Sequence, residues 1–513
     1  MTPRRPARPS AGSVGPVLAL LWITLLLGAC VAGTGSVLSP IADRTTTTGE
    51  AIDVGVTLSA PAPDAIVLEA VSDAPDLVPA AGLVFVGSGD ARSLRITPAP
   101  TGTGDARITV IARDAAGRTS TTSFRLDVVA PFGVELPRWL ASDGGADDVF
   151  GIALDAFGDE VVVGAYNDDD RGSGAGAAYV FRFEDGAWRE VVKLTASDGV
   201  IDDRFGHAVA IDGDVVMVSA RDHDAFGEDS GAVYVFGRDG DSWVEVQKLV
   251  GSDALAGDRY GAAIAISGDH ALVGADRVDL VGQDSGAVYP LRRVAGTWQT
   301  FDRIVPADAA TGQRFGNRID LSEANAVISA WGDGEAGLYA GAAYLFTFVL
   351  DGWQQGAKLM ASDAAVDDVF GSDVAIDRDR VLVSAENRYE GAPDVGAVYA
   401  FRHVGDVWVE TGKLIASDGG SGDRFGYAVA LHGDHALIGS RGTQGALTGS
   451  GAAYVFHLRD DVWSEVQRLT PTPAVDGDAF GASVALTFDH AFVGAYGTEA
   501  LGVPVGAVHA FER

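Results

Sequence analysis

The side chains best suited to chemistry in this sequence are carboxylates, which gather in short segments beyond residue 137. They include the run Asp168-Asp169-Asp170 and the nearby residues Asp222 and Asp224. Clustered carboxylate oxygens are the ligands that Ca²⁺ prefers, so Asp168, Asp170, Asp222 and Asp224 are weak candidates for a metal site. The alternative is a solvated acidic surface, and the presence of only four lysines in the chain agrees with it. No other cofactor is expected.

The sequence signatures of common hydrolases are absent. The sequence contains no Gly-X-Ser-X-Gly elbow, no His-Glu-X-X-His motif and no pair of cysteines. Paired carboxylates serve glycosidases, yet the aspartate pairs here recur in several copies without a distinct partner. We therefore expect no catalytic residues, and an enzyme acting on polysaccharide stays open as an alternative.

The charge of the chain excludes one large class of function. There are 71 acidic and 37 basic residues, which gives a formal net charge of −34. A nucleic-acid binder neutralises phosphates with a basic surface, so this chain is not expected to bind nucleic acid. A hydrophobic content of 47% excludes global disorder, and the single cysteine excludes an internal disulfide.

Residues 1–29 have the organisation of a bacterial export signal. Three arginines precede an apolar run that is too short for a comfortable membrane span, and a Gly-Ala-Cys sequence follows. The segment Leu27–Cys30 resembles the lipobox of bacterial lipoproteins, which implies that Cys30 is lipidated. Val31 replaces the aspartate that retains such lipoproteins in the inner membrane, so the resemblance implies the outer membrane in a Gram-negative host. The alternative is a plain secretory signal with an incidental cysteine.

The strongest pattern in the sequence is a repeat of 55 residues. A tryptophan and a Gly-Ala-X-Tyr segment recur in the same phase as an aromatic–glycine pair. The pairs begin at Phe150, Phe205, Tyr260, Phe315, Phe370, Phe425 and Phe480. Self-similarity at a period near 50 residues is typical of propellers and solenoids.

Each repeat is predicted to form four antiparallel strands separated by turn signals. The seventh copy stops after its third strand, and a segment matching the fourth strand precedes the first copy at 136–143. An N-terminal strand that completes the last blade closes a ring and removes exposed sheet edges. The sequence therefore predicts an all-β chain with a closed, seven-bladed β-propeller over residues 137–513.

Two further regions precede the predicted propeller. Residues 30–50 are rich in Gly, Ser and Thr and are expected to form a tether. Residues 51–129 alternate apolar and polar side chains in short runs, which predicts a small β-sandwich. This sandwich resembles bacterial Ig-like or cadherin-like surface modules and is expected to act as a spacer. Residues 130–136 are the expected linker.

The repeat resembles the FG-GAP repeat, which forms the blades of integrin-α-type propellers. The Phe-Gly pairs supply the first half of the motif, and Val163-Gly164-Ala165 and its counterparts supply the second. The resemblance covers about 138–513 and implies a binding or adhesion module for an extracellular protein or glycan. Blades of this family that bind Ca²⁺ carry an aspartate-rich loop between their first two strands. Here that connection is only Asp212-Gly213-Asp214 or its counterparts, so no Ca²⁺ ligand is carried over.

Two positions vary from copy to copy although their neighbours repeat. They follow the aromatic–glycine pair and the Val-Gly-Ala segment, and both are expected to line the mouth of the central channel. The candidate ligand-binding residues there are Trp331, Tyr166, Arg221, Arg441, Tyr496, His207, Asn317 and Tyr427. The alternative is sequence drift at unconstrained positions.

These features together predict a monomeric cell-envelope protein that is held at the membrane only by its lipid. Its propeller is expected to bind an extracellular protein or glycan. A structural subunit of an envelope complex is the remaining alternative, and the unbroken spacing of the repeats favours it slightly, because ligand-binding loops tend to diverge in length.

Overall fold

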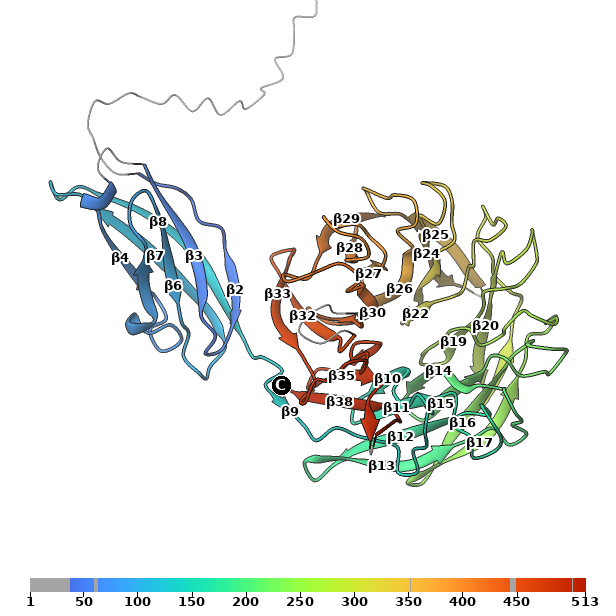
Figure 1. Cartoon of the computed structure of the whole chain (residues 1–513). Coiled ribbons are helices and arrows are strands. Elements are labelled where there is room, and N and C mark those ends of the chain that lie inside the picture. Colours follow the sequence, from blue (N-terminus) through green and yellow to red (C-terminus); the bar gives the residue numbers. More distant parts are fainter. Residues whose placement is uncertain (1–36, 60–62, 351, 443–448, 501) are drawn as a thin grey trace, which may run out of the picture.

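A computed structural model describes residues 37–513 apart from 60–62, 351, 443–448 and 501 (Figure 1). This described part is all β-structure, with two short 3₁₀ turns, Pro63–Ala65 and Ala80–Gly82, and no α-helix. It holds no helix with the length and apolar character needed to cross a bilayer. The expected signal peptide over 1–29 and Cys30 lie outside the described residues.

The N-terminal unit is a β-sandwich of two four-stranded sheets. One sheet has the order β1 (Val37–Leu38), β3 (Ile52–Ser59), β6 (Ala91–Ile96) and β5 (Leu83–Val86). The other has the order β2 (Arg44–Thr47), β8 (Thr119–Val129), β7 (Gly104–Arg113) and β4 (Val67–Ser72). Alternate residues of the strands point inward, and Leu94, Ile108 and Leu126 are fully buried in the shared core.

The tether expected over 30–50 is shorter than predicted, because β1 and β2 belong to the sandwich. Strand β2 pairs in parallel with β8, with Arg44 opposite Leu126. Thr46 and Thr47 are buried, and β-branched side chains suit a half-buried strand surface. The threonine run therefore forms an edge strand of the sandwich and does not belong to a polar tether.

The C-terminal unit is a ring of seven antiparallel four-stranded sheets, the blades of a β-propeller (Figure 1). Blade 1 is β10 (Ala153–Phe157), β11 (Glu160–Ala165), β12 (Ala177–Glu184) and β13 (Ala187–Leu194); blade 2 is β14 (Phe205–Asp212), β15 (Val215–Ala220), β16 (Ala232–Asp239) and β17 (Ser242–Leu249). Blade 3 is β18 (Ile264–Ser267), β19 (His270–Ala275), β20 (Ala287–Val294) and β21 (Thr297–Thr300); blade 4 is β22 (Ile319–Ser322), β23 (Asn325–Ala330), β24 (Ala342–Val349) and β25 (Gly352–Leu359). Blade 5 is β26 (Phe370–Asp377), β27 (Arg380–Ala385), β28 (Ala397–Val404) and β29 (Val407–Leu414); blade 6 is β30 (Phe425–His432), β31 (His435–Ser440), β32 (Ala452–Arg459) and β33 (Val462–Leu469). Blade 7 is β34 (Ser483–Leu486), β35 (His490–Ala495), β38 (Ala507–Glu512) and β9 (Val134–Glu135), and a small hairpin of β36 (Glu499–Ala500) and β37 (Val503–Pro504) precedes β38.

The ring is closed at both its inner and outer strands. The first strands of successive blades contact one another around the axis, and β34 contacts β10. The fourth strand of blade 7 is β9, which pairs with β38 through Glu135 opposite Phe511. Trp139 extends this pairing as a bridge to Val508. The closing strand therefore begins at Val134, inside the segment 130–136 that was expected to be a linker.

The glycines of the repeat motif are required where neighbouring blades touch. Gly206 has φ of +94°, and a Cβ there would lie 2.1 Å from the carbonyl oxygen of Ala177 in the preceding blade. A Cβ on Gly164 would lie 2.0 Å from the carbonyl oxygen of Gly206. The two glycines of the motif therefore face each other across a blade interface, where the backbones pack without side chains.

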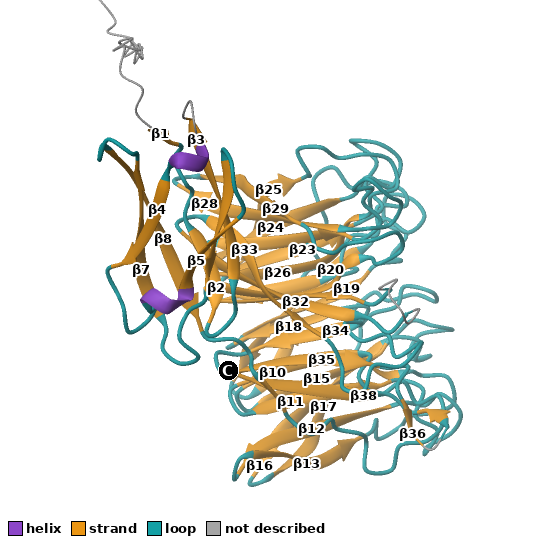
Figure 2. Ribbon diagram, turned by 60° about the vertical axis from the view of Figure 1, so that its left-hand side comes forward, coloured by secondary structure: helices purple, strands orange, loops and turns teal. Residues whose placement is uncertain are grey.

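The two faces of the propeller differ in their connections. Figure 2 shows the long loops gathered on one side of the disc and the sandwich on the other side. The loops that follow the second and fourth strands of each blade form the long-loop face, which lies away from the sandwich. Long loops on a rigid scaffold are where binding residues are usually found.

Candidate functional site

The aspartates of the long-loop face belong to a hydrogen-bonded set that recurs from blade to blade. The Tyr179 hydroxyl donates to Asp143 Oδ1 at 2.8 Å, and Lys193 Nζ donates to Asp143 Oδ2 at 2.8 Å. The same tyrosine–aspartate bond recurs at Tyr234–Asp198, Tyr289–Asp253, Tyr344–Asp308, Tyr399–Asp363 and Tyr454–Asp418. These carboxylates therefore hold the loops to the third strands.

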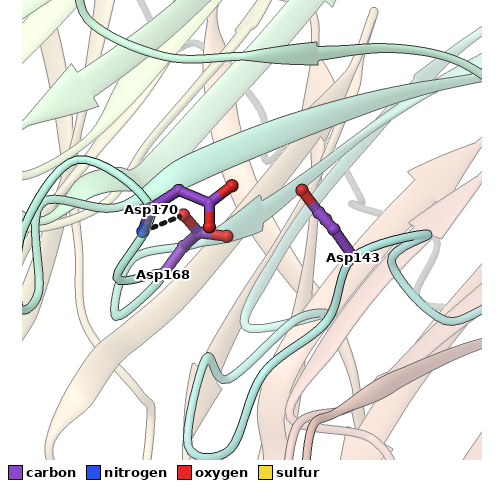
Figure 3. A group of neighbouring side chains, drawn as sticks. All are labelled: Asp143, Asp168 and Asp170. Carbon is purple, nitrogen blue, oxygen red and sulfur yellow. Dashed lines mark hydrogen bonds between the residues drawn. The ribbon is translucent and has the colours of Figure 1, made fainter.

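A lysine ammonium occupies the acidic group that was the best metal candidate. The carboxylate oxygens of Asp143, Asp168 and Asp170 lie within 4.8 Å of one another, on two neighbouring loops (Figure 3). Lys193 Nζ contacts Asp168 Oδ2 at 2.7 Å and Asp170 Oδ2 at 2.6 Å in addition to Asp143. Burial alone would lower the pKa of Lys193, but these hydrogen bonds raise it above its ordinary value. The Lys193 ammonium already takes the position between these oxygens that a metal ion would need, so the residues present do not fit a Ca²⁺ site.

All four lysines of the chain take this position in their repeats. Lys248, Lys358 and Lys413 contact Asp198, Asp308 and Asp363, each through Nζ. Arg303 and Arg468 occupy the position in the two remaining complete copies and pair with Asp253 and Asp418. The sequence signal for this arrangement is a basic residue at the same position of each complete repeat. The composition does not show it, because the composition gives the number of lysines and not their positions.

The other two metal candidates also have partners. Asp222 lies between Arg204 Nη1 and Arg259 Nε, each at 3.2 Å. The carboxylate of Asp224 accepts a hydrogen bond from the Asp229 N–H at 2.9 Å. Asp222 is therefore an anchor for arginines, and Asp224 stabilises its own loop.

The predicted ligand-binding residues lie at the long-loop end of the central axis, where all eight are half-buried. The two variable positions meet across blade interfaces. The rings of Tyr166 in blade 1 and His207 in blade 2 lie 6.0 Å apart, and Asn317 Nδ2 in blade 4 donates to Asp276 of blade 3 at 3.3 Å. The residue after Val-Gly-Ala in one blade thus contacts the residue after Phe-Gly in the next blade.

Three further contact groups complete this set of side chains around the axis, which we call the mouth ring. The Arg441 guanidinium stacks over Tyr427 at 3.8 Å and donates to the Tyr496 hydroxyl at 3.3 Å. Trp331 lies 5.9 Å from Tyr339 and 5.7 Å from the Arg314 guanidinium. Arg221 Nε lies 3.5 Å from Asp222.

Burial and neighbouring arginines change the protonation of the mouth ring. Burial, followed by the charge of Arg221, holds the pKa of His207 well below its ordinary value, so this imidazole is neutral at pH 7. Burial raises the pKa of the Glu386 carboxyl, which the charges of Arg424 and Arg441 oppose. The surface therefore offers aromatic rings and guanidinium donors beside neutral or weakly acidic groups.

Arg318 is a mouth-ring residue that the sequence reasoning missed. Four of the other blades have alanine at its position, namely Ala153, Ala208, Ala263 and Ala428. Arg318 Nε lies 3.5 Å from Asp373, and its charge acts on His207, Glu386 and Tyr427, which belong to three other blades. Arg318 therefore lies close to the axis. The available sequence signal was an arginine at a repeat position where four other blades have alanine.

A second hollow lies at the opposite end of the axis, among the short turns. It has a volume of about 690 Å³ and is lined by the first strands of the blades. Burial raises the pKa of Asp155 there to about 7, and it raises the pKa values of Asp320 and Asp373 to about 6. Each of these carboxylates accepts a backbone N–H from the next blade, at Ile211, Ile376 and Val429. They therefore join neighbouring blades.

The chain was compared with curated proteins, solved structures and family models. No curated protein matches the chain. Solved structures match over about a fifth of it, including the titin M3 domain, with 21% identity, 19% of this chain, 98% of that chain and a TM-score of 0.15. The Dpr1 IG1 domain bound to DIP-eta IG1 is similar at 13% identity, over 19% of this chain and 97% of that chain, with a TM-score of 0.15. Scores this low carry no argument about function.

The propeller matches a family model, which carries the description FG-GAP repeat, in seven successive segments. The matched residues are 135–181, 188–236, 243–291, 298–346, 353–401, 408–456 and 463–511. The first match begins in β9 and each later one begins in a fourth strand, so the family unit runs from the outer strand of one blade to the third strand of the next. Most of the chain is covered in phase with the observed blades, and the protein belongs to the FG-GAP repeat family.

Proposed function

We propose that this protein is an exported, lipid-anchored binding module whose mouth ring recognises an extracellular protein or glycan. The observation that carries the proposal is the variation of the mouth ring within an otherwise regular propeller. Aromatic, cationic and amide side chains gather at one end of the axis and stay half-exposed. Fold membership does not itself fix a ligand, so the proposal depends on these side chains.

The chemistry of the mouth ring suits recognition more than catalysis. Tyrosine, tryptophan and arginine supply large contact areas and fixed donors, and they are the side chains that dominate binding energy at interfaces. Arg441 contacts both Tyr427 and Tyr496, and Trp331 lies near Tyr339 and Arg314. These contacts hold the side chains in place before a ligand arrives, which lowers the entropic cost of binding.

The orientation of the propeller supports the same function. The sandwich contacts the short-turn side of blade 6, where Arg459 pairs with Asp105 and Asp127. The mouth ring lies on the long-loop side, which is opposite the sandwich (Figure 2). A lipid on Cys30 would then hold the protein at a membrane with the mouth ring directed away from it.

Array binding tests the recognition proposal. The labelled full chain is applied to arrays of glycans and extracellular proteins, alongside Trp331→Ala and Arg441→Ala. We expect both variants to lose at least about tenfold in affinity, since each removes an interface anchor of about 1.4 kcal/mol or more. Arg378→Ala at the opposite end of the axis, whose side chain is 75% exposed, is the control and should bind like the wild type.

Equal binding by all four proteins would contradict the role of the mouth ring. New reducing ends in a bound glycan would support the enzyme alternative instead. Mass spectrometry of the exported protein tests the anchor separately, because a diacylglycerol adduct must be present on the wild type and absent from Cys30→Ser.

A further inference from the structure

Blade 3 departs from the regular plan of the other blades at its outer edge. Its fourth strand, β21, covers only Thr297–Thr300, whereas the fourth strands of blades 1, 2, 4, 5 and 6 have 8 residues each. The cause is Pro290, which stands inside β20 where other third strands carry Val, Leu or Ala. Proline has no N–H to donate, so the ladder to the fourth strand is interrupted.

The interruption displaces a short segment of chain. The Phe301 N–H still donates to the Pro290 carbonyl at 2.9 Å, and pairing resumes where Val288 and Ile304 exchange backbone hydrogen bonds at 3.0 and 2.8 Å. Asp302 and Arg303, which lie between these points, leave the ladder. A cavity of about 310 Å³ opens between blades 3 and 4, and we call it the edge pocket.

Aromatic side chains form one part of the wall of the edge pocket. His270 of blade 3 and Phe348 and Trp353 of blade 4 form a triad, with ring centroids 4.3 Å apart for His270–Phe348 and 5.6 Å for Phe348–Trp353. The rest of the wall consists of Phe301, Ile304, Pro290, Leu291 and Gly352 and the charged residues Arg292, Asp302 and Arg303. His270 Nδ1 is buried and has no hydrogen-bond partner among the described residues. The pocket therefore offers ring-stacking surfaces and one unused polar atom.

Among the described blades, the same triad occurs at one other interface, where a further side chain covers it. His490 of blade 7 packs against Phe183 and Trp188 of blade 1, with centroids at 4.9 and 5.3 Å. The indole of Trp139 lies on this triad, 5.0 Å from Trp188, and only 7% of Trp139 is exposed. This interface shows what the His–Phe–Trp arrangement accepts, which is an indole ring.

Ile304 is the counterpart of Trp139 in the edge pocket. Trp139 bridges to Val508 in the third strand of blade 7, and Ile304 bridges to Val288 at the same position of blade 3. An isoleucine side chain is much smaller than an indole, and the displaced Asp302–Arg303 segment does not cover the difference. The edge pocket is therefore an indole site without its indole.

We propose that the edge pocket binds a small planar aromatic acid of the indole class. The rings of Phe348 and Trp353 would contact the ligand ring, and His270 Nδ1 would meet a polar atom on it. The acidic group is assigned from Arg292 at the rim, whose exposed guanidinium lies 5.9 Å from the Phe348 ring and forms no ion pair with any described residue. This site goes beyond the proposed function, since it lies at the perimeter and shares no residue with the mouth ring.

Indole-3-acetate is the probe for this proposal, measured by isothermal titration calorimetry and by saturation-transfer NMR on the full chain. We expect the wild type to bind it with a Kd below about 1 mM. Ile304→Trp places the protein's own indole in the pocket, as in blade 7, and should weaken binding by at least about tenfold. Ile304→Leu introduces the residue of most other blades and is the matched control, with affinity within about threefold of the wild type.

Two more variants keep the test decisive if Ile304→Trp folds poorly. Pro290→Val restores the missing N–H, so the ladder should re-form and binding should be lost. Arg292→Met should remove the preference for indole-3-acetate over indole while leaving indole binding in place. Absence of binding by the wild type, or equal binding by the wild type, Ile304→Trp and Pro290→Val, would overturn the proposal. Array binding through the mouth ring is unaffected by either result.

Discussion

At the scale of single residues, the main finding is that lysines form ion pairs with the acidic loops. A chain with net charge −34 would be expected to keep its carboxylates apart or to bind cations. Here each of the four lysines lies on an aspartate of the loop that leads into its own blade, and Lys193 contacts three carboxylates at once. The position of a few basic residues, and not their number, decides the character of this face.

Replacement of Lys193 by methionine tests this arrangement. Lys193→Met keeps the aliphatic packing but leaves Asp143, Asp168 and Asp170 uncompensated, and Asp168 is buried. We expect a loss of about 1–3 kcal/mol in the free energy of unfolding by urea, discounted because two of the carboxylates are partly exposed. Arg189→Met, an exposed change on the same strand, is the control and should cost less than about 0.5 kcal/mol.

Calcium distinguishes the wild type from this variant. The melting temperature of the wild type should not rise with Ca²⁺ beyond its response to Mg²⁺ and matched NaCl. Lys193→Met should gain a Ca²⁺-dependent rise, because three carboxylates are then open to a cation. A Ca²⁺-specific rise in the wild type would show that the lysine does not close the site.

At the scale of strands, neighbouring blades are joined by side chains of their first strands. Asp155 of β10 accepts the Ile211 N–H of β14 at 2.8 Å, and Ser267 of β18 accepts the Glu323 N–H at 3.0 Å. Most other blades have alanine at the position of Asp155. A carboxylate is therefore not required to join neighbouring blades. Burial of the Asp155 carboxylate costs free energy of folding that burial of a serine hydroxyl does not.

That cost appears as a pH dependence of stability. Burial raises the pKa of Asp155 from 3.8 to about 7, so the folded state keeps a proton that the unfolded state loses first. The contribution of Asp155 to the free energy of unfolding is complete below about pH 4 and is lost as the pH rises towards 7. Between pH 4 and pH 8, the stability of Asp155→Ala relative to the wild type should improve by about 1–3 kcal/mol in urea titrations. For the Ser267→Ala control the difference should be the same at both pH values, and a flat profile for Asp155→Ala would contradict the assignment.

The sequence was sufficient to predict the strands and the number of blades, but not the side-chain contacts between them. The period of the Phe-Gly pairs predicts seven blades, and the segment around Trp139 predicts the closing strand, although β9 begins earlier, at Val134. The contact of Lys193 with the acidic loop could have been predicted, because a basic residue recurs at this position of the repeat. The edge pocket could not have been found in this way, because it depends on the difference in volume between Trp139 and Ile304 at triads that only the folded ring aligns.

At the scale of the whole molecule, the sandwich is fastened to the propeller by charged and backbone contacts. Arg459 of blade 6 pairs with Asp105 and Asp127 of the sandwich, and Arg125 pairs with Asp460 at 3.4 Å. In the connecting segment, the Phe132 N–H and carbonyl both bond to the Gln467 amide, each at 2.9 Å. These contacts give the two units a preferred orientation.

Removal of the Arg459 guanidinium should loosen that orientation without unfolding either unit. For Arg459→Met we expect a broader interdomain distance distribution by small-angle X-ray scattering, with a propeller melting temperature within about 4 °C of the wild type. Raising the salt concentration should broaden the wild type in the same direction. An unchanged distribution for Arg459→Met would mean that Gln467 and Phe132 alone fix the two units.

The route by which the chain enters the ring also decides how the molecule would carry a mechanical load. Tension applied from the N-terminal side passes through β8 of the sandwich and reaches the propeller at β9, the strand that seals blade 7. That seam consists of two residue pairs, the bond from the Leu136 N–H to the Ala510 carbonyl, the bridge between Trp139 and Val508, and the buried indole of Trp139. The seam would therefore yield before the other blades, whose fourth strands lie outside the line of force.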